Sequence, residues 1–185
     1  MDDDAILDLF AARAETAICE TSHKYNGYCL KIAMNILQSK EDAEECVNDT
    51  FLRAWNSIPP ERPVVFRAYL AKIVRNLSLD KFKQSTRKKR GGDSVTIMLS
   101  ELEECLVSNS GVESEFDRGL MVQALNNFLE ELDAENRLVF MRRYWYSDSI
   151  ATIAEGCRMS ESKVKSMLFR TRRKLKLYLK KEGLM

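Results

Sequence analysis

The sequence has few of the side chains on which metal sites and catalytic pairs depend. Its only histidine, His23, lies in a polar stretch without an obvious orienting partner, which argues against a poly-histidine metal site and against a Ser/His or Cys/His pair. No glycine-rich phosphate-binding loop is present either. We therefore do not expect an enzyme, and we expect no catalytic residue, no metal and no cofactor.

The five cysteines lack the pattern of a disulfide framework or a zinc site. They are odd in number, widely spaced and free of any CxxC pair. They stand at Cys19, Cys29, Cys46, Cys105 and Cys157. Because cysteine is often an interior residue, we expect most of them to be small buried apolar side chains.

Long hydrophobic runs are also missing. No uncharged stretch approaches the length that spans a bilayer, and the start, MDDDAILDLF, is acidic where a secretory signal is basic. Export and membrane insertion are therefore not expected. The sequence predicts a protein of the cytoplasm.

Proline is scarce and sustained β-branched alternation is absent. The three prolines stand at 59, 60 and 63, so long stretches of the chain contain no helix breaker. A hydrophobic content of 45% with 31% charged residues is typical of a globular protein, and 185 residues suffice for two small helical domains. The sequence therefore predicts an all-α fold.

Charge is strongly segregated, although the whole chain carries a net charge of only +1. Residues 71–90 hold eight bases against one acid, residues 91–117 hold seven acids and no base, and residues 158–181 hold ten bases against one acid. Gly91-Gly92 ends the first basic segment. We predict a helical domain at 1–90, an acidic linker at 91–117 and a second helical domain, with a helix-turn-helix, at 118–185.

Residues 41–55 are predicted to form a helix with two distinct faces. The inward face recurs at spacings of three and four: Ala43, Val47, Thr50, Phe51, Ala54 and Trp55. Asp42, Glu45 and Asp49 align on the other side. The pattern alone is consistent with a solvated acidic face. The alternative is a docking stripe for a basic partner, with Leu52 as an apolar anchor on its flank.

A further helix is predicted from about Phe66, after a proline-stiffened loop. Its apolar stripe consists of Phe66, Tyr69, Leu70, Ile73, Val74 and Leu77. The opposite side carries Lys72, Arg75, Asn76, Leu79 and Lys83. A cationic face of this kind can track phosphates, and aromatic side chains beside positive charge can hold unpaired bases. Tyr69 is either such a stacking surface or a core residue.

The C-terminal segment has the pattern of a helix-turn-helix. A short helix with Ile150, Ile153 and Ala154 inward is followed by a turn at Gly156 to Met159 and by a second helix that Ser160 caps. The predicted buried stripe of the second helix is Val164, Leu168, Thr171, Leu175 and Tyr178. Polar donors face outward, as a recognition helix in the major groove requires. The alternative is an ordinary surface helix with a basic tail.

Three segments resemble parts of bacterial sigma factors. EDAEECVNDTFLRAWNSI resembles their core-binding helix, and FRAYLAKIVRNLSLDKFKQ resembles their promoter-melting and minus-ten-reading helix. NRLVFMRRYWYSDSIATIAEGCRMSESKVKSMLFRTRRKLKLYL resembles their minus-thirty-five helix-turn-helix, with landmarks at Arg137, Phe140, Arg143-Tyr144, Ile153-Ala154 and Val164-Lys165. The likeness covers most of 20–90 and 120–180. With two domains and a short linker, the chain is similar to the extracytoplasmic-function group of the sigma-70 family.

The resemblance implies a factor that binds core RNA polymerase and directs promoter recognition and DNA melting in transcription initiation. The implied polymerase-binding residues are Asp42, Glu45, Asp49 and Leu52. The implied minus-ten contacts are Arg67, Tyr69, Lys72, Arg75, Asn76 and Lys83, with residues 60–65 capturing an extruded base. The implied minus-thirty-five contacts are Ser160, Ser162, Lys163, Lys165, Ser166, Arg170 and Arg173. An anti-sigma factor is a further candidate partner.

The acidic linker suggests a hypothesis of its own. By analogy with the family it would thread toward the template and RNA path, where its carboxylates mimic nucleic-acid charge. In the free chain, the same carboxylates would shield the two basic segments until polymerase docking separates them.

The sequence departs from the family pattern at three places. Leu132-Asp133 replaces a frequent Leu-Pro, but aspartate is itself a good N-cap, so only a helix start should change. Tyr69 replaces a frequent Trp and Lys163 a frequent Thr. Both positions are candidate DNA contacts, so the promoter sequence does not transfer from relatives.

Two other classes of protein remain as alternatives. A stand-alone helix-turn-helix regulator explains residues 137–181 equally well, but it gives the acidic helix and the melting-type helix no task. A helical interaction protein with solvated basic faces is the other.

Overall fold

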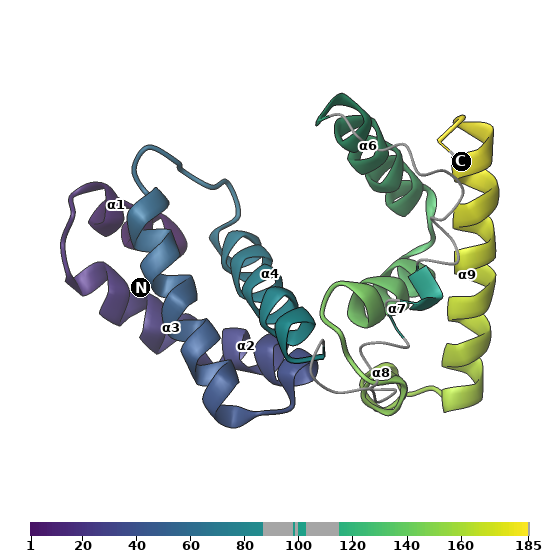
Figure 1. Cartoon of the computed structure of the whole chain (residues 1–185), viewed down its shortest axis with the longest axis horizontal. Coiled ribbons are helices and arrows are strands. Elements are labelled where there is room, and N and C mark those ends of the chain that lie inside the picture. The colour runs from purple at the N-terminus through teal and green to yellow at the C-terminus, as the bar shows by residue number, and fades with distance from the viewer. Residues whose placement is uncertain (87–97, 99, 103–114, 185) are drawn as a thin grey trace. The chain divides into compact units, whose positions relative to one another are not determined.

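The computed structural model describes residues 1–86, 98, 100–102 and 115–184, and every regular element in these ranges is an α-helix (Figure 1). The predicted all-α fold is confirmed. The chain divides into two compact units, residues 1–91 and 92–185. The predicted limits of the domains and the linker stay predictions, because much of 91–117 lies outside the described ranges. Among the described helices, none is both long and apolar enough to cross a membrane.

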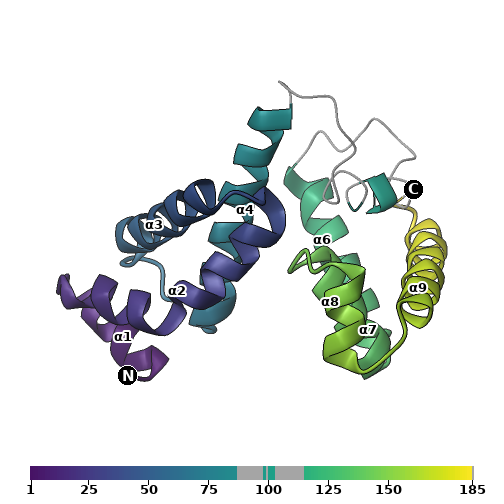
Figure 2. The ribbon, with the colours of Figure 1, turned by 90° about the horizontal axis from the view of Figure 1, so that it is seen from below.

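The N-terminal unit consists of α1 (Asp3–Ala11), α2 (Thr16–Leu37), α3 (Lys40–Ser57) and α4 (Phe66–Thr86). Helices α2, α3 and α4 pack against one another, and α1 packs on α2 (Figures 1 and 2). Each helix buries one stripe and exposes the other side, as an amphipathic helix must. This arrangement leaves the outer faces of α3 and α4 available to partners.

Aromatic side chains form the centre of this unit. The ring centroids of Phe10 and Phe66 lie 5.8 Å apart, and those of Tyr25 and Phe66 are separated by the same distance, both in edge-on geometry. Phe66 is 1% exposed. Burying a phenylalanine of this kind stabilises a fold by about 1.5–3 kcal/mol, so Phe66 fixes the first turn of α4 in place.

The boundaries of α3 follow from local chemistry. Gln38 adopts a left-handed conformation, with φ of 55°, and ends α2. Ser39 then caps α3, because its side chain accepts a hydrogen bond from the backbone N–H of Asp42 at 3.3 Å. The predicted inward face is confirmed, except that Trp55 is half-buried, and Cys46 joins the buried stripe.

The C-terminal unit contains α6 (Glu115–Glu131), α7 (Ala134–Tyr144), α8 (Ile150–Cys157) and α9 (Glu161–Lys181). Helices α7 and α8 pack on α9 and on each other, and α6 contacts α9 (Figure 1). The predicted buried stripe of α9 is confirmed at four positions, whereas the fifth, Tyr178, is half-buried and its ring centroid lies 5.6 Å from that of Phe128.

The caps predicted for this unit are confirmed. The Asp133 side chain accepts from the backbone N–H of Asn136 at 2.9 Å, so the departure from Leu-Pro leaves α7 with a capped start. The Ser160 side chain accepts from the backbone N–H of Lys163 at 3.2 Å and caps α9.

The prediction that Gly156 makes the turn between α8 and α9 was wrong. Gly156 lies inside α8, and the residue in the left-handed conformation is Arg158, with φ of 54°. Gly156 instead accommodates a close approach, because a Cβ atom at this position would overlap Nη1 of Arg142.

Only four residues between 87 and 114 are described. Met98 is 1% exposed, and Glu101 reaches the side chains of the C-terminal unit. The remainder of the predicted acidic linker up to residue 114, and the basic residues 87–90, lie outside the described residues, as does Cys105.

Candidate nucleic-acid interface

The acidic stripe of α3 lies on the surface of the N-terminal unit. Glu45 and Asp49 are exposed and Asp42 is half-buried, so the predicted outer face of the helix is confirmed. Leu52, which follows Asp49 by three residues, is 54% exposed. The surface therefore combines carboxylates with one uncovered apolar side chain, which suits a partner that is basic and partly apolar.

Lys81 of α4 pairs with two carboxylates of this stripe. Its Nζ lies 2.8 Å from Oδ1 of Asp42 and 2.6 Å from Oε2 of Glu45. Hydrogen bonds from Lys81 and Ser39 hold the pKa of the Asp42 carboxyl below its ordinary value. Partial burial tends to lower the pKa of Lys81, but the same two carboxylates outweigh this effect and raise the pKa. Sequence reasoning counted Lys81 as part of a basic segment and missed this pairing.

The predicted minus-ten residues of α4 occupy different environments. Four of them are exposed: Arg67, Lys72, Asn76 and Lys83. Arg75 was expected on the outer side with them, but it is half-buried, and this burial lowers the pKa of its guanidinium. Tyr69 is also half-buried, and burial raises the pKa of its hydroxyl. The exposed cationic face of α4 is consequently narrower than the sequence indicated, because it lacks most of Tyr69 and Arg75.

A cation lies over an aromatic ring at the start of α4. The guanidinium carbon of Arg67 is 4.4 Å from the ring centroid of Tyr28 in α2. This stacking limits the orientations of Arg67 and presents a flat, positively charged surface. Tyr28 was absent from the sequence-based set of candidates, because its contact with Arg67 arises only when α2 packs on α4.

The loop before α4 has a buried start and an exposed end. Ile58 is 2% exposed, whereas Val65 is 58% exposed and Val64 is fully exposed. Uncovered valines next to a cationic helix are consistent with a surface that receives an apolar or aromatic ligand. They lie within residues 60–65, the segment that the family resemblance implies for capture of an extruded base.

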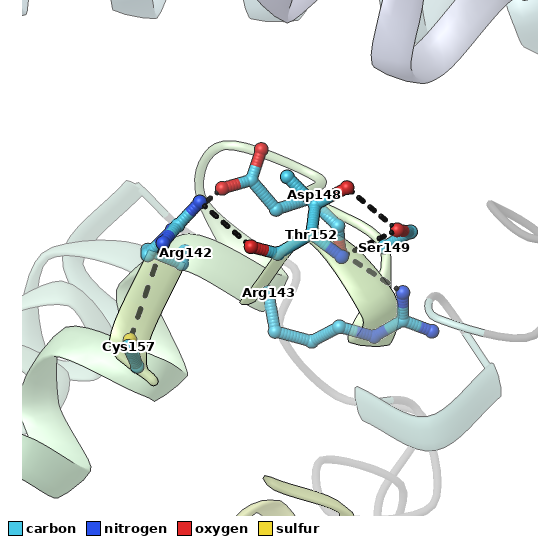
Figure 3. A network of polar contacts seen from close by, with 6 residues as sticks. All are labelled: Arg142, Arg143, Asp148, Ser149, Thr152 and Cys157. Atoms are coloured by element: carbon cyan, nitrogen blue, oxygen red, sulfur yellow. Dashed lines mark hydrogen bonds and ion pairs between the residues drawn. The ribbon is translucent and has the colours of Figure 1, made fainter. Parts of the chain in front are cut away.

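A polar network fixes α8 against α7 (Figure 3). Nε of Arg142 donates to Oδ2 of Asp148 at 2.7 Å, and Nη2 donates to the carbonyl oxygen of Thr152 at 3.4 Å. Burial tends to lower the pKa of the Arg142 guanidinium, but the Asp148 carboxylate outweighs this effect and raises the pKa. The neighbouring Arg143 donates to the carbonyl oxygen of Asp148 at 3.2 Å. Two arginines of α7 therefore hold the turn that aims α8 and α9.

A second cluster joins the described part of the acidic segment to this unit. Glu101 Oε2 accepts from the Tyr144 hydroxyl at 2.9 Å and lies 3.3 Å from Nη1 of Arg172 and 3.8 Å from Nε of Arg143. The Arg172 guanidinium also donates to the Tyr144 hydroxyl at 2.8 Å. Glu101 is thus a counter-ion for two enclosed arginines.

The outer face of α9 carries all of the predicted minus-thirty-five residues. Each of the seven is exposed: Ser160, Ser162, Lys163, Lys165, Ser166, Arg170 and Arg173. Two lysines already have a carboxylate partner: Lys163 lies 3.2 Å from Glu135 of α7, and Lys165 lies 3.7 Å from Glu161. Exposed pairs of this type are weak and are exchanged readily for a phosphate.

Sequence reasoning missed Phe169 on this face. The ring is 60% exposed and lines a shallow concave surface with Lys165, Ser166 and Arg170. A signal was available, because Phe169 follows Ser166 by three residues and therefore shares its side of the helix.

The described cysteines and acids do not form a metal centre. No group of three or more His, Cys, Asp or Glu side chains that could hold a metal ion occurs in the part of the chain that the structure describes. Cys29 and Cys46 are buried, Cys157 is half-buried and Cys19 is exposed, so the expected burial applies to two of the four described cysteines. Burial raises the pKa of the Cys29 thiol to about 12.

Comparison with known proteins places both units in one family. The model for Sigma-70 region 2 matches residues 23–88, and the model for Sigma-70, region 4 matches residues 123–175. The chain is 30% identical over 180 residues to the ECF RNA polymerase sigma factor SigL of Mycobacterium tuberculosis, an alignment that spans 94% of this chain and 95% of that protein. It is 24% identical over 174 residues to the RNA polymerase sigma factor SigV of Bacillus subtilis, which spans 93% and 95%.

Proposed function

This chain belongs to the extracytoplasmic-function group of the sigma-70 family of RNA polymerase sigma factors, and from that premise we propose which of its surfaces contact polymerase and promoter DNA. As a sigma factor it directs promoter recognition, and its partners are core RNA polymerase and promoter DNA. Nothing in the comparisons supports a stand-alone regulator. The individual contact residues, and the boundaries of the domains that carry them, are the subject of the proposal.

The proposed polymerase surface is the acidic stripe of α3. Asp42, Glu45 and Asp49 would bind a positively charged helical clamp of the core enzyme, and Leu52 would insert as the apolar anchor. The observation that carries this assignment is the exposed leucine beside exposed carboxylates, because a partner that covers the leucine removes its apolar surface from water and so stabilises the complex.

The proposed minus-ten surface is the outer face of α4 with the loop before it. Arg67, Lys72, Asn76 and Lys83 would contact the backbone and bases of the opening DNA. Val64 and Val65 are exposed where an extruded base would be held. Tyr69 and Arg75 would contribute through their exposed parts, because both are half-buried.

The proposed minus-thirty-five surface is the outer face of α9. Its seven exposed polar and basic residues would enter the major groove, with donors near the N-terminal half of the helix reaching base edges. Lys163 and Lys165 would exchange their carboxylate partners for phosphates. Such contacts are salt-dependent, because phosphate binding releases counterions.

The remaining parts of the proposal concern the setting of the protein. The chain would transfer no nucleotide itself, since the active site belongs to the polymerase that it directs. It would work in the cytoplasm, where the polymerase acts. An anti-sigma factor is proposed as the partner that withholds it from the polymerase.

The test of the function is run-off transcription with purified chain and core RNA polymerase on the chain's own upstream region. We expect specific initiation that requires both proteins. DNA binding without polymerase-dependent initiation would instead indicate a regulator.

The test of the docking surface is the charge reversal Asp49→Lys. We expect this variant to lose association with core polymerase while the helical content of the chain is unchanged, because a lysine would face the basic clamp. Asp80→Lys, which reverses an exposed acid of α4, is the matched control and should associate normally. Wild-type association of Asp49→Lys would refute the assignment, and co-elution on size exclusion measures both variants.

A further inference from the structure

The loop between α3 and α4 has buried ends and an exposed middle. Ile58 and Phe66 are at most 2% exposed. Between them, residues 59–65 are exposed except for Pro63, which is half-buried. Exposed segments with few packed neighbours adopt many conformations unless another part of the protein holds them. The conformation of this loop therefore depends on the contacts that its exposed residues make elsewhere.

One such contact comes from the start of the chain. Nη2 of Arg62 donates to Oδ1 of Asp8 in α1 at 2.9 Å, across 54 positions of the sequence. Both side chains are more than half exposed, so the contact orients the loop more than it stabilises the fold. Glu61 interacts with the hydroxyl of Tyr69. The exposed part of the loop is thus held by α1 through Arg62 and by α4 through Glu61.

Side chains of the same N-terminal segment also contact the residues that flank the loop. The ring centroid of Phe10 lies 6.1 Å from that of Trp55, near the end of α3, and 5.8 Å from that of Phe66, the first residue of α4 (Figure 1). Just after α1, the guanidinium carbon of Arg13 lies 5.3 Å from the ring centroid of Trp55, and its Nη1 donates to the carbonyl oxygen of that residue. Residues 8–13 therefore contact the chain before, within and after the loop.

Helix α1 is itself fixed on α2. Oδ1 of Asp3 accepts hydrogen bonds from Nζ of Lys24 at 2.6 Å and from the Tyr25 hydroxyl at 2.5 Å. The inner face of α1 is buried: Ile6, Leu7 and Phe10. Because α1 cannot move freely, an ion pair from Asp8 restricts the loop to the neighbourhood of a fixed point.

We propose that α1 holds residues 58–65 in the conformation that receives the extruded base, and that Asp8 is a positioning residue that acts through Arg62. The inference rests on the proposed function, because it requires this loop to capture a base. A loop that is already ordered loses less conformational entropy when the base enters, so capture becomes more favourable. Asp8 touches no DNA itself, unlike the proposed contact residues of α4.

The competing role for this pair is direct contact between Arg62 and a DNA phosphate. In that role Asp8 competes with the phosphate, so removing the charge of Asp8 strengthens binding. In the positioning role the two residues act as a unit, so removing either charge weakens capture equally and removing both weakens it no further. The two roles predict opposite effects of Asp8→Asn.

The experiment measures how strongly the holoenzyme, formed from the full chain and core polymerase, holds the extruded base. The wild-type holoenzyme first selects its promoter from randomised duplex DNA. The non-template strand of the minus-ten element is then made abasic at one position at a time, and the captured base is the one whose removal weakens binding most. The readout is the ratio of the affinities for the intact strand and for this abasic strand.

We expect Asp8→Asn and Arg62→Gln each to lower this ratio by up to about fivefold at low salt, the limit for an exposed ion pair. The double variant should lower the ratio no further, and Asp8→Arg combined with Arg62→Asp should restore most of it. Asp4→Asn removes an exposed charge from the same helix and is the matched control, so its ratio should equal that of the wild type. Circular dichroism and co-elution with core polymerase verify that each variant is folded and assembled.

Two results would overturn the inference. One is an unchanged ratio for Asp8→Asn, including equal weakening on both strands, because the effect would then not pass through the base. The other is tighter binding by Asp8→Asn, which would assign Arg62 to a phosphate. Failure of the proposed function is a separate outcome, since the wild-type holoenzyme would then bind the intact strand and every abasic strand equally.

Discussion

Gly156 and Arg142 illustrate how one side chain determines what another position accepts. The Arg142 guanidinium lies against the backbone of α8, where its Nη1 is within reach of Cys157 Sγ at 4.0 Å. It is held there by Asp148 and by the Thr152 carbonyl oxygen. A Cβ atom at position 156 would overlap this Nη1, so any larger residue there requires the guanidinium to shift.

Gly156→Ala should therefore destabilise the C-terminal unit. The new methyl group can be accommodated only if Arg142 moves, which breaks its bond to the enclosed Asp148 carboxylate. Overpacking of this kind costs about 1–3 kcal/mol, and the helix propensity gained by replacing glycine with alanine offsets about 0.5–1 kcal/mol of that cost. Urea titration with hydrogen exchange of α8 peptides measures the effect in the full chain.

Gly119→Ala is the control for this prediction. It lies in α6 with no atom within 4 Å of an added Cβ, so the same substitution should stabilise the helix by about 0.5–1 kcal/mol. If Gly156→Ala were as stable as the wild type, Arg142 would not be the reason for the glycine.

Helices α3 and α4 are connected by Lys81 across their packed faces. Its two carboxylate partners, Asp42 and Glu45, are also proposed to bind the polymerase. Lys81 and the polymerase therefore compete for the same oxygens. Asp49, the third acid of the stripe, is not among the ion-pair partners of Lys81. Its carboxylate can therefore bind the polymerase without displacing Lys81.

Lys81→Met should consequently bind core polymerase more tightly, by up to about fivefold at low salt, since exposed ion pairs contribute up to about 1 kcal/mol. The gain should shrink as ionic strength rises. Fluorescence titration of core enzyme without DNA measures it. Lys83→Met, an exposed lysine two residues on, should bind as the wild type does. Weaker binding by Lys81→Met would mean that Lys81 positions the carboxylates instead of competing for them.

The molecule as a whole is nearly neutral, but its charges are divided among segments. The hypothesis of a shielding linker makes no distinction among the carboxylates of residues 91–117, which include Glu101, Glu103 and Glu104. Glu101 contributes little to shielding of the basic segments, because its carboxylate already neutralises Arg143 and Arg172. A shielding effect is therefore expected from the other two acids, which lie outside the described residues.

The double variant Glu103→Gln and Glu104→Gln should raise the affinity of the polymerase-free chain for DNA. Removing two negative charges strengthens phosphate attraction several-fold at low salt, and the difference should fade once the Debye length falls to about 10 Å near 0.1 M salt. Filter binding to nonspecific duplex measures the change. Asp4→Asn with Glu20→Gln removes the same charge from the N-terminal unit and tests whether position matters. Equal affinities for all three chains would reject shielding.

The sequence by itself determined the all-α class, most of the inner faces of α3 and α9, and the caps at Asp133 and Ser160. Periodicity and capping depend on residues within about four positions of one another, so Ser160, Asp133 and the inner face of α3 were predicted correctly. The family resemblance was likewise readable in three short segments. The site residues on α9 were predicted to be exposed and are exposed.

Only the tertiary structure decided which charged side chains remain available to partners. Lys81 meets Glu45 across 36 positions of the sequence, and Glu101 meets Tyr144 across 43. Arg75 is half-buried although its helical position placed it outside, and Gly156 is needed for Arg142 instead of the turn. Each of these depends on how helices pack, which the spacing of residues along one helix does not contain.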